Sequence, residues 1–318
     1  MAKYRHNLPQ LGDAVFLTDS GLETTLIYLD GIDLPFFAAF DLLKTRGGRA
    51  RLRAYYDLHA RMAARNGVGF VLEAPTWRAS ADWGDRLGYN AARLDKANRD
   101  AVALMAEVRR DYETPMSPMV ISGNLGPRGD GYNPDALMTA DEAEDYHAPQ
   151  IESFRLAEAD MVAAFTMTNI PEAVGIARAA RHAGMPVAIS FTVETDGRLP
   201  TGQLLRDAIG LVDAATEWYP AYYMINCAQP AHFEDALKAG EGWTRRVRGI
   251  RANASRRSHA ELDVATELDP GNPEELGRQY RDIRKLFKGI TVLGGCCGTD
   301  HRHVHEIARW CQPVEAAA

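Results

Sequence analysis

The feature that most constrains the fold is a regular alternation of short apolar runs with longer amphipathic stretches. Stretches with helical spacing span residues 49–67, 90–112, 139–159, 171–184, 202–219 and 272–287. Eight apolar runs bounded by Gly, Pro, Asn or Asp are predicted strands, at residues 14–20, 69–76, 118–126, 161–167, 186–193, 222–228, 247–254 and 290–297. Apolar strands that are each followed by a helix are typical of a parallel sheet covered on its outer face. Eight such units close most simply into a barrel, so the sequence predicts an α/β protein with a single (β/α)8 TIM barrel.

The same pattern continues through the sequence, so we expect one domain over residues 1–318. An open dinucleotide-binding sheet would need a Gly-x-Gly-x-x-Gly turn after an early strand, and residues 18–26 lack it. The segment at about 19–48 is too long for a simple loop after the first strand, and it contains the apolar run Pro-Phe-Phe-Ala-Ala-Phe at 35–40. It is suited to a lid or to a contact between copies of the chain, which makes a homo-oligomer plausible.

Charge and hydropathy narrow the range of partners. The formal net charge is −7, and no basic block is longer than two residues, so nucleic acid and anionic lipid are not expected partners. No apolar run reaches 18 residues, and the first residues are polar, which argues against export or a membrane span. We therefore expect a cytoplasmic protein that acts on small molecules.

Reactive residue types collect at the predicted carboxyl ends of the strands, where (β/α)8 enzymes carry their catalytic groups. Three of the four cysteines reach this rim from two different strands. In a cytoplasmic chain, such cysteines favour metal binding or catalysis over a disulfide framework. The residues expected at the rim are Asp19, Glu73, Thr76, Asn124, Asn226, Cys227, Asn253, Cys296 and Cys297.

Three thiolates with no histidine close by suit a soft, tetrahedral ion such as zinc with one position left open. The candidate ligands are Cys227, Cys296 and Cys297. Two other interpretations stay open: buried cysteines that serve packing alone, and a vicinal disulfide between the adjacent Cys296 and Cys297 or a redox sensor. If zinc is bound, three anionic sulfurs make it a poor Lewis acid but leave a further bound thiolate electron-rich, which favours alkyl transfer to sulfur over hydrolysis.

Two cysteine motifs carry a resemblance to a known family. Gly-Gly-Cys-Cys-Gly-Thr stands at residues 294–299, and Asn-Cys-x-x-Pro stands at 226–230. In these motifs, and in Asp19, Gly21 and the Gly-Pro pair at 126–127, the chain resembles the cobalamin-independent, zinc-dependent homocysteine S-methyltransferases over about residues 14–308. That family includes betaine- and S-methylmethionine-dependent enzymes.

The resemblance implies a zinc ion on the three rim cysteines of a (β/α)8 barrel. It also implies methyl transfer from an onium donor, such as betaine or S-methylmethionine, to the zinc-bound sulfur of homocysteine, which gives methionine. The small-molecule partners would then be a thiol and a methyl donor.

The chain also departs from the family pattern. After the fourth strand the family usually has Glu-Thr, whose carboxylate helps to hold the amino group of homocysteine, whereas this chain has Phe165-Thr166. Ser20 and Glu23 stand where glycines are common, and Glu73 stands where a small polar residue is usual. Either Glu73 takes over the ammonium group from a neighbouring strand, or the acceptor is another thiol.

These considerations assign catalytic roles to Asp19 and Glu73. A carboxylate at the barrel mouth needs a partner for its buried charge, which an amino-acid ammonium group would supply, although Glu73 could instead pair with Arg78. The expected substrate-binding residues are Asp19, Glu73, Asn226, Phe165, Thr76 and Trp77. Aromatic residues that could cage an onium group, or simply pack, are Trp77, Trp83, Phe36, Phe37, Tyr132 and Phe165.

The histidines at 301, 303 and 305 are expected on the surface, and Cys311 is expected to be structural or free. The sequence therefore predicts a zinc-dependent thiol methyltransferase. A barrel that acts on a different thiol, and a non-catalytic zinc-binding or redox-sensing protein, remain as alternatives.

Overall fold

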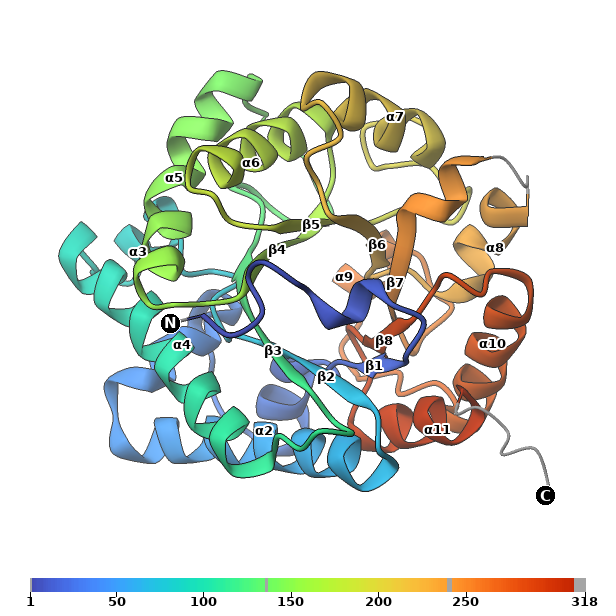
Figure 1. Ribbon diagram of the computed structural model, residues 1–318, viewed down its shortest axis with the longest axis horizontal. Helices are drawn as coiled ribbons and strands as arrows, with labels where there is room; N and C mark the ends of the chain where they lie inside the picture. Colours follow the sequence, from blue (N-terminus) through green and yellow to red (C-terminus); the bar gives the residue numbers. More distant parts are fainter. Residues whose placement is uncertain (1, 135–136, 239–241, 312–318) are drawn as a thin grey trace.

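The computed structural model describes residues 2–134, 137–238 and 242–311. Its strands form one closed parallel barrel in which each strand pairs with the next in the chain and the last pairs with the first (Figure 1). The predicted TIM barrel is thereby confirmed. The strands are β1 (Phe16–Leu17), β2 (Gly69–Glu73), β3 (Met119–Leu125), β4 (Met161–Met167), β5 (Val187–Phe191), β6 (Tyr222–Asn226), β7 (Val247–Ala252) and β8 (Val292–Gly295).

Helices cover the outside of the barrel between the strands (Figure 1). Several begin at residues that the sequence marks clearly: the Asn90, Thr139, Asn169 and Asn272 side chains each accept a hydrogen bond from a first-turn amide. The helices are α1 (Leu22–Thr24), α2 (Arg46–Asn66), α3 (Ala81–Arg86), α4 (Ala91–Tyr112), α5 (Ala140–Leu156), α6 (Ile170–His182), α7 (Leu205–Ala215), α8 (Pro230–Lys238), α9 (His259–Asp263), α10 (Pro273–Leu286) and α11 (His301–Cys311).

The segment after β1 is built from short helical turns and not from an open loop. It contains α1 and then η2 (Thr25–Leu29), η3 (Pro35–Phe37) and η4 (Ala39–Lys44). The aromatic residues of its apolar run have different environments. Phe40 is buried against Tyr89, whereas the Phe36 and Phe37 side chains are 44% and 52% exposed. The segment therefore packs onto the barrel while two of its aromatic rings remain at the surface.

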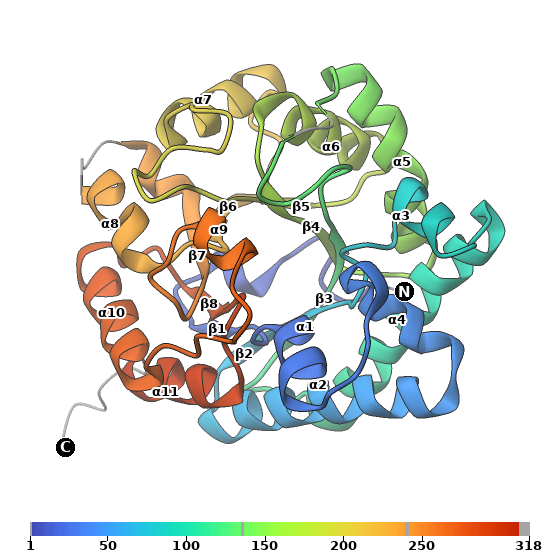
Figure 2. The ribbon, with the colours of Figure 1, turned by 180° about the vertical axis from the view of Figure 1, so that it is seen from behind.

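Different segments of the chain lie at the two ends of the barrel. The chain before β1, with η1 (Pro9–Leu11), crosses one end in Figure 1, and Leu8 packs there into the interior cluster of the barrel. Figure 2 shows the opposite end, where α1 and α9 lie close to the mouth. The carboxyl ends of the strands, and hence the predicted rim, lie at this second end. No helix of the described part is both long and apolar enough to cross a membrane.

Candidate active site and metal centre

Three cysteines meet at the carboxyl ends of β6 and β8. Cys227 directly follows β6, Cys296 and Cys297 directly follow β8, and their sulfur atoms all lie within 4.8 Å of one another. Cys227 and Cys296 are joined in a disulfide, and the Cys297 thiol is free. The three cysteines predicted at the rim therefore lie together, with Cys227 and Cys296 in the oxidised state.

The cysteine geometry suits a tetrahedral zinc site once that pair is reduced. With zinc–sulfur bonds of about 2.3 Å, two sulfur ligands of a tetrahedral ion lie about 3.8 Å apart. The Sγ atoms of Cys227 and Cys297 are 3.8 Å apart. Both members of the disulfide would have to be thiolates to bind a metal, so metal binding requires the reduced protein.

Tight backbone packing brings the cysteines together. Cys227 has a left-handed backbone with φ of 51°, and its carbonyl oxygen accepts a hydrogen bond of 3.0 Å from the Asn253 side chain. A Cβ atom added at Gly295 would collide with the Thr299 hydroxyl. That hydroxyl is fixed because it donates to the Cys296 carbonyl at 2.7 Å and accepts from the Gly21 amide at 3.0 Å. The glycine before the cysteine pair is therefore required for close approach of β8 to the first loop.

The cysteines form one wall of a cavity at the mouth of the barrel. Five of the six predicted substrate-binding residues line it: Asp19, Glu73, Asn226, Phe165 and Trp77. Thr76 does not line it; its hydroxyl donates to the Asn124 carbonyl oxygen at 2.8 Å and so links the loop after β2 to β3. Further lining residues include Glu23, Tyr56, Asn124, Thr166 and Arg251.

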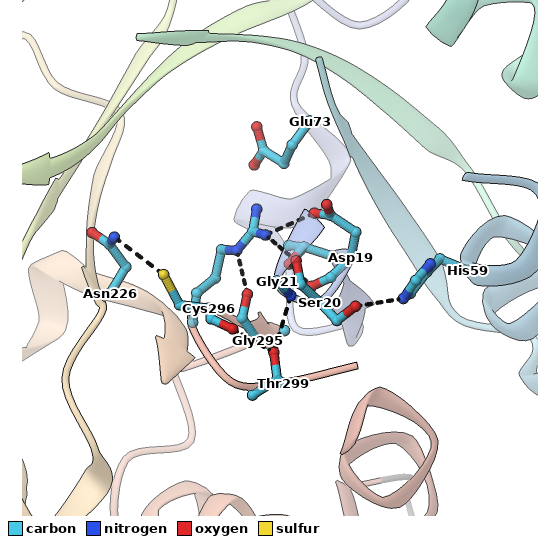
Figure 3. Close-up of polar contacts among 12 residues, drawn as sticks. Asp19, Ser20, Gly21, His59, Glu73, Asn226, Gly295, Cys296 and Thr299 are labelled. Carbon is cyan, nitrogen blue, oxygen red and sulfur yellow. Dashed lines mark hydrogen bonds and ion pairs between the residues drawn. The ribbon is translucent and has the colours of Figure 1, made fainter. Parts of the chain in front are cut away.

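Asp19 is paired with a residue of the protein itself. Its Oδ1 lies 2.8 Å from Arg251 Nη2, and its Oδ2 accepts a hydrogen bond of 3.0 Å from the Tyr55 hydroxyl. Arg251 also donates to the carbonyl oxygens of Ser20 and Gly295, which ties β7 to the loops after β1 and β8 (Figure 3). The sequence interpretation missed Arg251. The predicted strand at 247–254 contains two arginines, Arg248 and Arg251, but its sequence does not tell which of them faces the cavity.

Glu73 has no comparable partner. Its side chain is 2% exposed, and Oε2 accepts no hydrogen bond from the residues that the structure describes. Burial raises the pKa of Glu73 to about 8, although the positive charge of Arg251 acts in the opposite direction. The alternative pairing with Arg78 is not present, because that guanidinium lies 4.0 Å from the centre of the Trp77 ring and donates to the Gly129 carbonyl oxygen. Figure 3 shows the Glu73 carboxylate without a polar contact to the Asp19 group.

Glu23 is a second carboxylate in the cavity wall. It lies in the first turn of α1, and burial raises its pKa to about 7, an effect to which the negative charge of Asp19 adds. The sequence interpretation noted Glu23 only as a departure from the family pattern. A positively charged ligand in the cavity would stabilise the anionic forms of these two carboxylates, whose pKa values are raised by burial.

Asn226 acts as a clamp between β4, β5 and β6. Its Oδ1 accepts hydrogen bonds from the Thr166 amide at 2.9 Å and from the Ser190 hydroxyl at 2.6 Å, and its Nδ2 donates to the Thr166 hydroxyl at 2.9 Å. These bonds hold Thr166 in a left-handed conformation with φ of 62°. Asn226 Nδ2 also lies 3.9 Å from Cys296 Sγ. Figure 3 shows this contact as a dashed line.

The aromatic residues separate into two groups. Trp77 and Phe165 line the cavity, and the Tyr132 hydroxyl lies 3.2 Å from Cys297 Sγ while its ring stacks on His259. Phe36 packs on Trp83 outside the cavity wall, so this pair joins the segment after β1 to α3.

The histidines of α11 correct one expectation. His301 and His305 are exposed as expected, but His303 is fully buried. Its Nε2 lies 2.8 Å from the Pro270 carbonyl oxygen, and its Nδ1 lies 3.3 Å from Asp300. The surface prediction was wrong for His303 because the loop before α10 covers that face of α11.

Comparison with solved structures identifies the same fold in another protein. The homocysteine methyltransferase MmuM from Escherichia coli, in its oxidised form, superposes with a TM-score of 0.76 at 19% identity, over 95% of this chain and 97% of MmuM. Its metallated form superposes with a TM-score of 0.73 at 19% identity, over 96% and 98% of the two chains.

Sequence comparison identifies the family. The chain is 25% identical to homocysteine S-methyltransferase YbgG from Bacillus subtilis over 62% of each chain, so the match spans less than two thirds of that relative. It is 26% identical to the homocysteine S-methyltransferase of Escherichia coli over 67% of this chain and 72% of the relative. The family model described as homocysteine S-methyltransferase matches residues 16–311, which confirms the family that the sequence motifs indicate. Because this match covers nearly the whole chain, the protein belongs to the homocysteine S-methyltransferase family.

Proposed function

We propose that this protein is a zinc-dependent S-methyltransferase. It would move a methyl group from an onium donor, such as betaine or S-methylmethionine, to the sulfur of a thiol, with homocysteine as the first candidate and methionine as the product. The observation that carries the proposal is the convergence of three cysteine sulfurs on the wall of a cavity that also holds carboxylates and aromatic rings.

The metal ligands would be Cys227, Cys296 and Cys297, which fit a tetrahedral ion in number and spacing. A bound zinc ion would supply the positive charge that keeps the acceptor sulfur deprotonated at neutral pH. Asn226 supports the arrangement by fixing the end of β6 next to Cys227 and by placing its amide near Cys296. The Tyr132 hydroxyl lies 3.2 Å from Cys297 Sγ, close enough to donate a hydrogen bond to a thiolate there.

The reaction would be a direct displacement. The acceptor thiolate attacks the methyl carbon, a carbon–sulfur bond forms, and the bond from that carbon to the nitrogen or sulfur of the donor breaks. The electron pair of the broken bond leaves with the donor, which becomes neutral at that atom. The protein contributes mainly by holding donor and acceptor in line, which can supply a large part of the rate enhancement.

The cavity wall is suited to a cationic donor. Glu23 and Glu73 place carboxylates in the wall, and Trp77 and Phe165 provide aromatic faces. Glu73 Oε2 is buried without a hydrogen-bond partner among the described residues. An onium group is attracted to both kinds of surface. Asp19 would act by orienting Arg251 and Tyr55, since its own charge is already balanced by the arginine.

Metal analysis tests the proposed centre. The reduced protein is expected to bind one zinc ion per chain, and Cys297→Ser is expected to lower that occupancy strongly. Cys311→Ser is the matched control, because Cys311 is buried in α11 and lies outside the cavity wall. A low zinc content that Cys297→Ser leaves unchanged would exclude the metal centre.

A redox-sensing role is a second candidate, and the disulfide between Cys227 and Cys296 is the observation that favours it. The two roles differ in their products. A methyltransferase forms a methylated thiol from a donor and an acceptor under reducing conditions. A sensor forms none under any condition, although its cysteine pair still cycles between thiol and disulfide.

A further inference from the structure

His259 approaches the cysteines from the short helix that follows β7. It is the first residue of α9, whose start is fixed by a capping box between Ser258 and Glu261. Its ring is buried, although α9 lies close to the mouth of the barrel (Figure 2). His259 lies outside both the cysteine cluster and the cavity wall, so neither of them explains why a histidine is buried here.

Both ring nitrogens of His259 face oxygen acceptors. Nε2 lies 2.7 Å from the Cys227 carbonyl oxygen, and Nδ1 lies 3.0 Å from Glu194 Oε1. A carbonyl oxygen only accepts hydrogen bonds, so Nε2 donates the proton in that contact. Glu194 holds the opposite edge of the ring and thereby fixes the direction in which Nε2 points.

The Cys227 backbone is the first point at which His259 acts on the cysteines. Cys227 has a left-handed backbone with φ of 51°, and a residue other than glycine keeps this conformation only where its surroundings hold it. Its carbonyl oxygen accepts hydrogen bonds from Asn253, directly after β7, and from His259 on α9. The histidine thus helps to fix the backbone from which the Cys227 sulfur projects.

The same ring reaches a second cysteine through Tyr132. The ring centroids of His259 and Tyr132 are 4.1 Å apart, and the ring planes are inclined by 17°, which is a stacked arrangement. The Tyr132 hydroxyl lies 3.2 Å from Cys297 Sγ. Cys227 and Cys297, whose Sγ atoms are 3.8 Å apart, are therefore both connected to one imidazole ring.

We propose that His259 is a positioning residue of the metal centre, which holds Cys227 and Cys297 at the spacing that one tetrahedral ion requires. This inference rests on the proposed function, since it concerns the proposed zinc centre. It adds a residue that binds no metal itself, because the donating nitrogen of His259 faces a carbonyl oxygen and not a sulfur. Removal of such a partner of a ligand residue typically lowers metal affinity by about 10- to 100-fold.

The affinity of the reduced protein for zinc, measured by competition with a chromophoric chelator, tests the inference. His259→Phe keeps a ring that can stack on Tyr132 but cannot donate to Cys227, and it is expected to weaken zinc binding by about 10- to 100-fold. His259→Gln places an amide nitrogen at the position of Nε2 and is expected to recover most of the affinity, whereas the shorter His259→Asn does not.

His147→Phe is the matched control for lost stability. His147 is also buried and also pairs with a glutamate, Glu172, but it lies on α5 among the helices outside the barrel. It is expected to lower stability and to leave the zinc affinity unchanged. An equal loss of zinc affinity in His147→Phe and His259→Phe would overturn the inference.

Cobalt in place of zinc gives a readout of the geometry of the centre itself. Tetrahedral cobalt–thiolate sites absorb visible light, and His259→Phe is expected to change these bands at saturating Co²⁺, whereas His147→Phe leaves them as in the wild type. Glu194→Ala serves if His259→Phe does not fold, because the Glu194 side chain is 34% exposed and touches only the far edge of the ring. It is expected to weaken zinc binding in the same direction by a smaller factor.

Two results separate this inference from the proposed function. Unchanged zinc affinity and cobalt bands in folded His259→Phe, or in Glu194→Ala if the former does not fold, would overturn the role of His259 alone. A reduced wild-type protein that binds neither Zn²⁺ nor Co²⁺ would overturn the proposed metal centre, and the role of His259 with it.

Discussion

Arg251 Nη2 lies 2.8 Å from Asp19 Oδ1, and both side chains are buried at the mouth of the barrel. This ion pair connects β7 to the loop after β1, and Arg251 extends the connection to the loop that carries two of the cysteines. The sequence analysis assigns the Asp19 carboxylate to substrate binding. In the structure this carboxylate pairs with Arg251 and positions it.

Removing the arginine is expected to destabilise the protein. Arg251→Met leaves the Asp19 carboxylate buried without its ion-pair partner, which costs about 3–5 kcal/mol of the free energy of unfolding. The double variant Asp19→Asn/Arg251→Met is expected to recover part of that loss because the unpaired charge is gone. Urea denaturation measures both, and Lys96→Ala, which breaks an exposed pair with Asp100, is expected to cost less than about 1 kcal/mol. A double variant no more stable than Arg251→Met would contradict this account.

Glu73 is expected to make the stability of the ligand-free protein depend on pH. Its pKa is raised from 4.5 to about 8, so the folded state keeps the proton that the unfolded chain releases. Stability is therefore lost as the pH rises through this window, by on the order of 1–4 kcal/mol. Glu73→Gln should remove that loss. Urea denaturation midpoints of the wild type and of Glu73→Gln at the two ends of this pH window measure the loss of stability. If stability falls equally with pH in both proteins, Glu73 is not the cause of the loss.

Gly295→Ala is expected to damage the cysteine site. A Cβ atom there collides with the Thr299 hydroxyl, which holds the Gly21 amide and the Cys296 carbonyl. Overpacking of this kind costs about 1–3 kcal/mol, and the shift should also lower the zinc content of the reduced protein. Gly289→Ala is the matched control, because its added Cβ meets no atom within 4 Å. Equal zinc content in the two variants would refute the packing argument.

Asn226→Ala is expected to reduce both stability and methyl transfer. The change leaves the Thr166 amide and the Ser190 hydroxyl without their buried acceptor, which costs about 1–3 kcal/mol. Because Cys227 follows directly in the chain, kcat should fall more than the affinity for the donor. Steady-state kinetics separate the two, and an unchanged kcat in a folded variant would show that the clamp does not position the site.

The fold and the meeting of the cysteines could be predicted because both follow from regular features. Strand ends of a parallel barrel share one rim, so Cys227, Cys296 and Cys297 had to lie at the same end. The role of Arg251 could not be predicted, because whether a strand residue faces the interior depends on the register. The register between β6 and β7 shifts between Tyr223 and Met224. A one-residue shift reverses the face that a side chain presents.

The positions of three further side chains were not predicted correctly from the sequence, because each depends on an irregular segment or on helix packing. Glu23 reaches the cavity only because short helical turns replace an open loop after β1, and local sequence does not specify that path. Thr76 lies two residues away from the cavity-lining Ala74, but its hydroxyl satisfies a β3 carbonyl instead. His303 is buried because of how α11 packs, which its i, i+2, i+4 spacing does not reveal.

The most direct test of the central claim is methyl transfer followed by mass spectrometry. The reduced, zinc-loaded protein is incubated with homocysteine and either betaine or S-methylmethionine that carries deuterium in its transferable methyl groups. The account predicts methionine that retains the labelled methyl group, at a rate that Cys297→Ser abolishes and Cys311→Ser leaves unchanged. The absence of any labelled methylated thiol, with the wild-type protein folded and zinc-loaded, would contradict it.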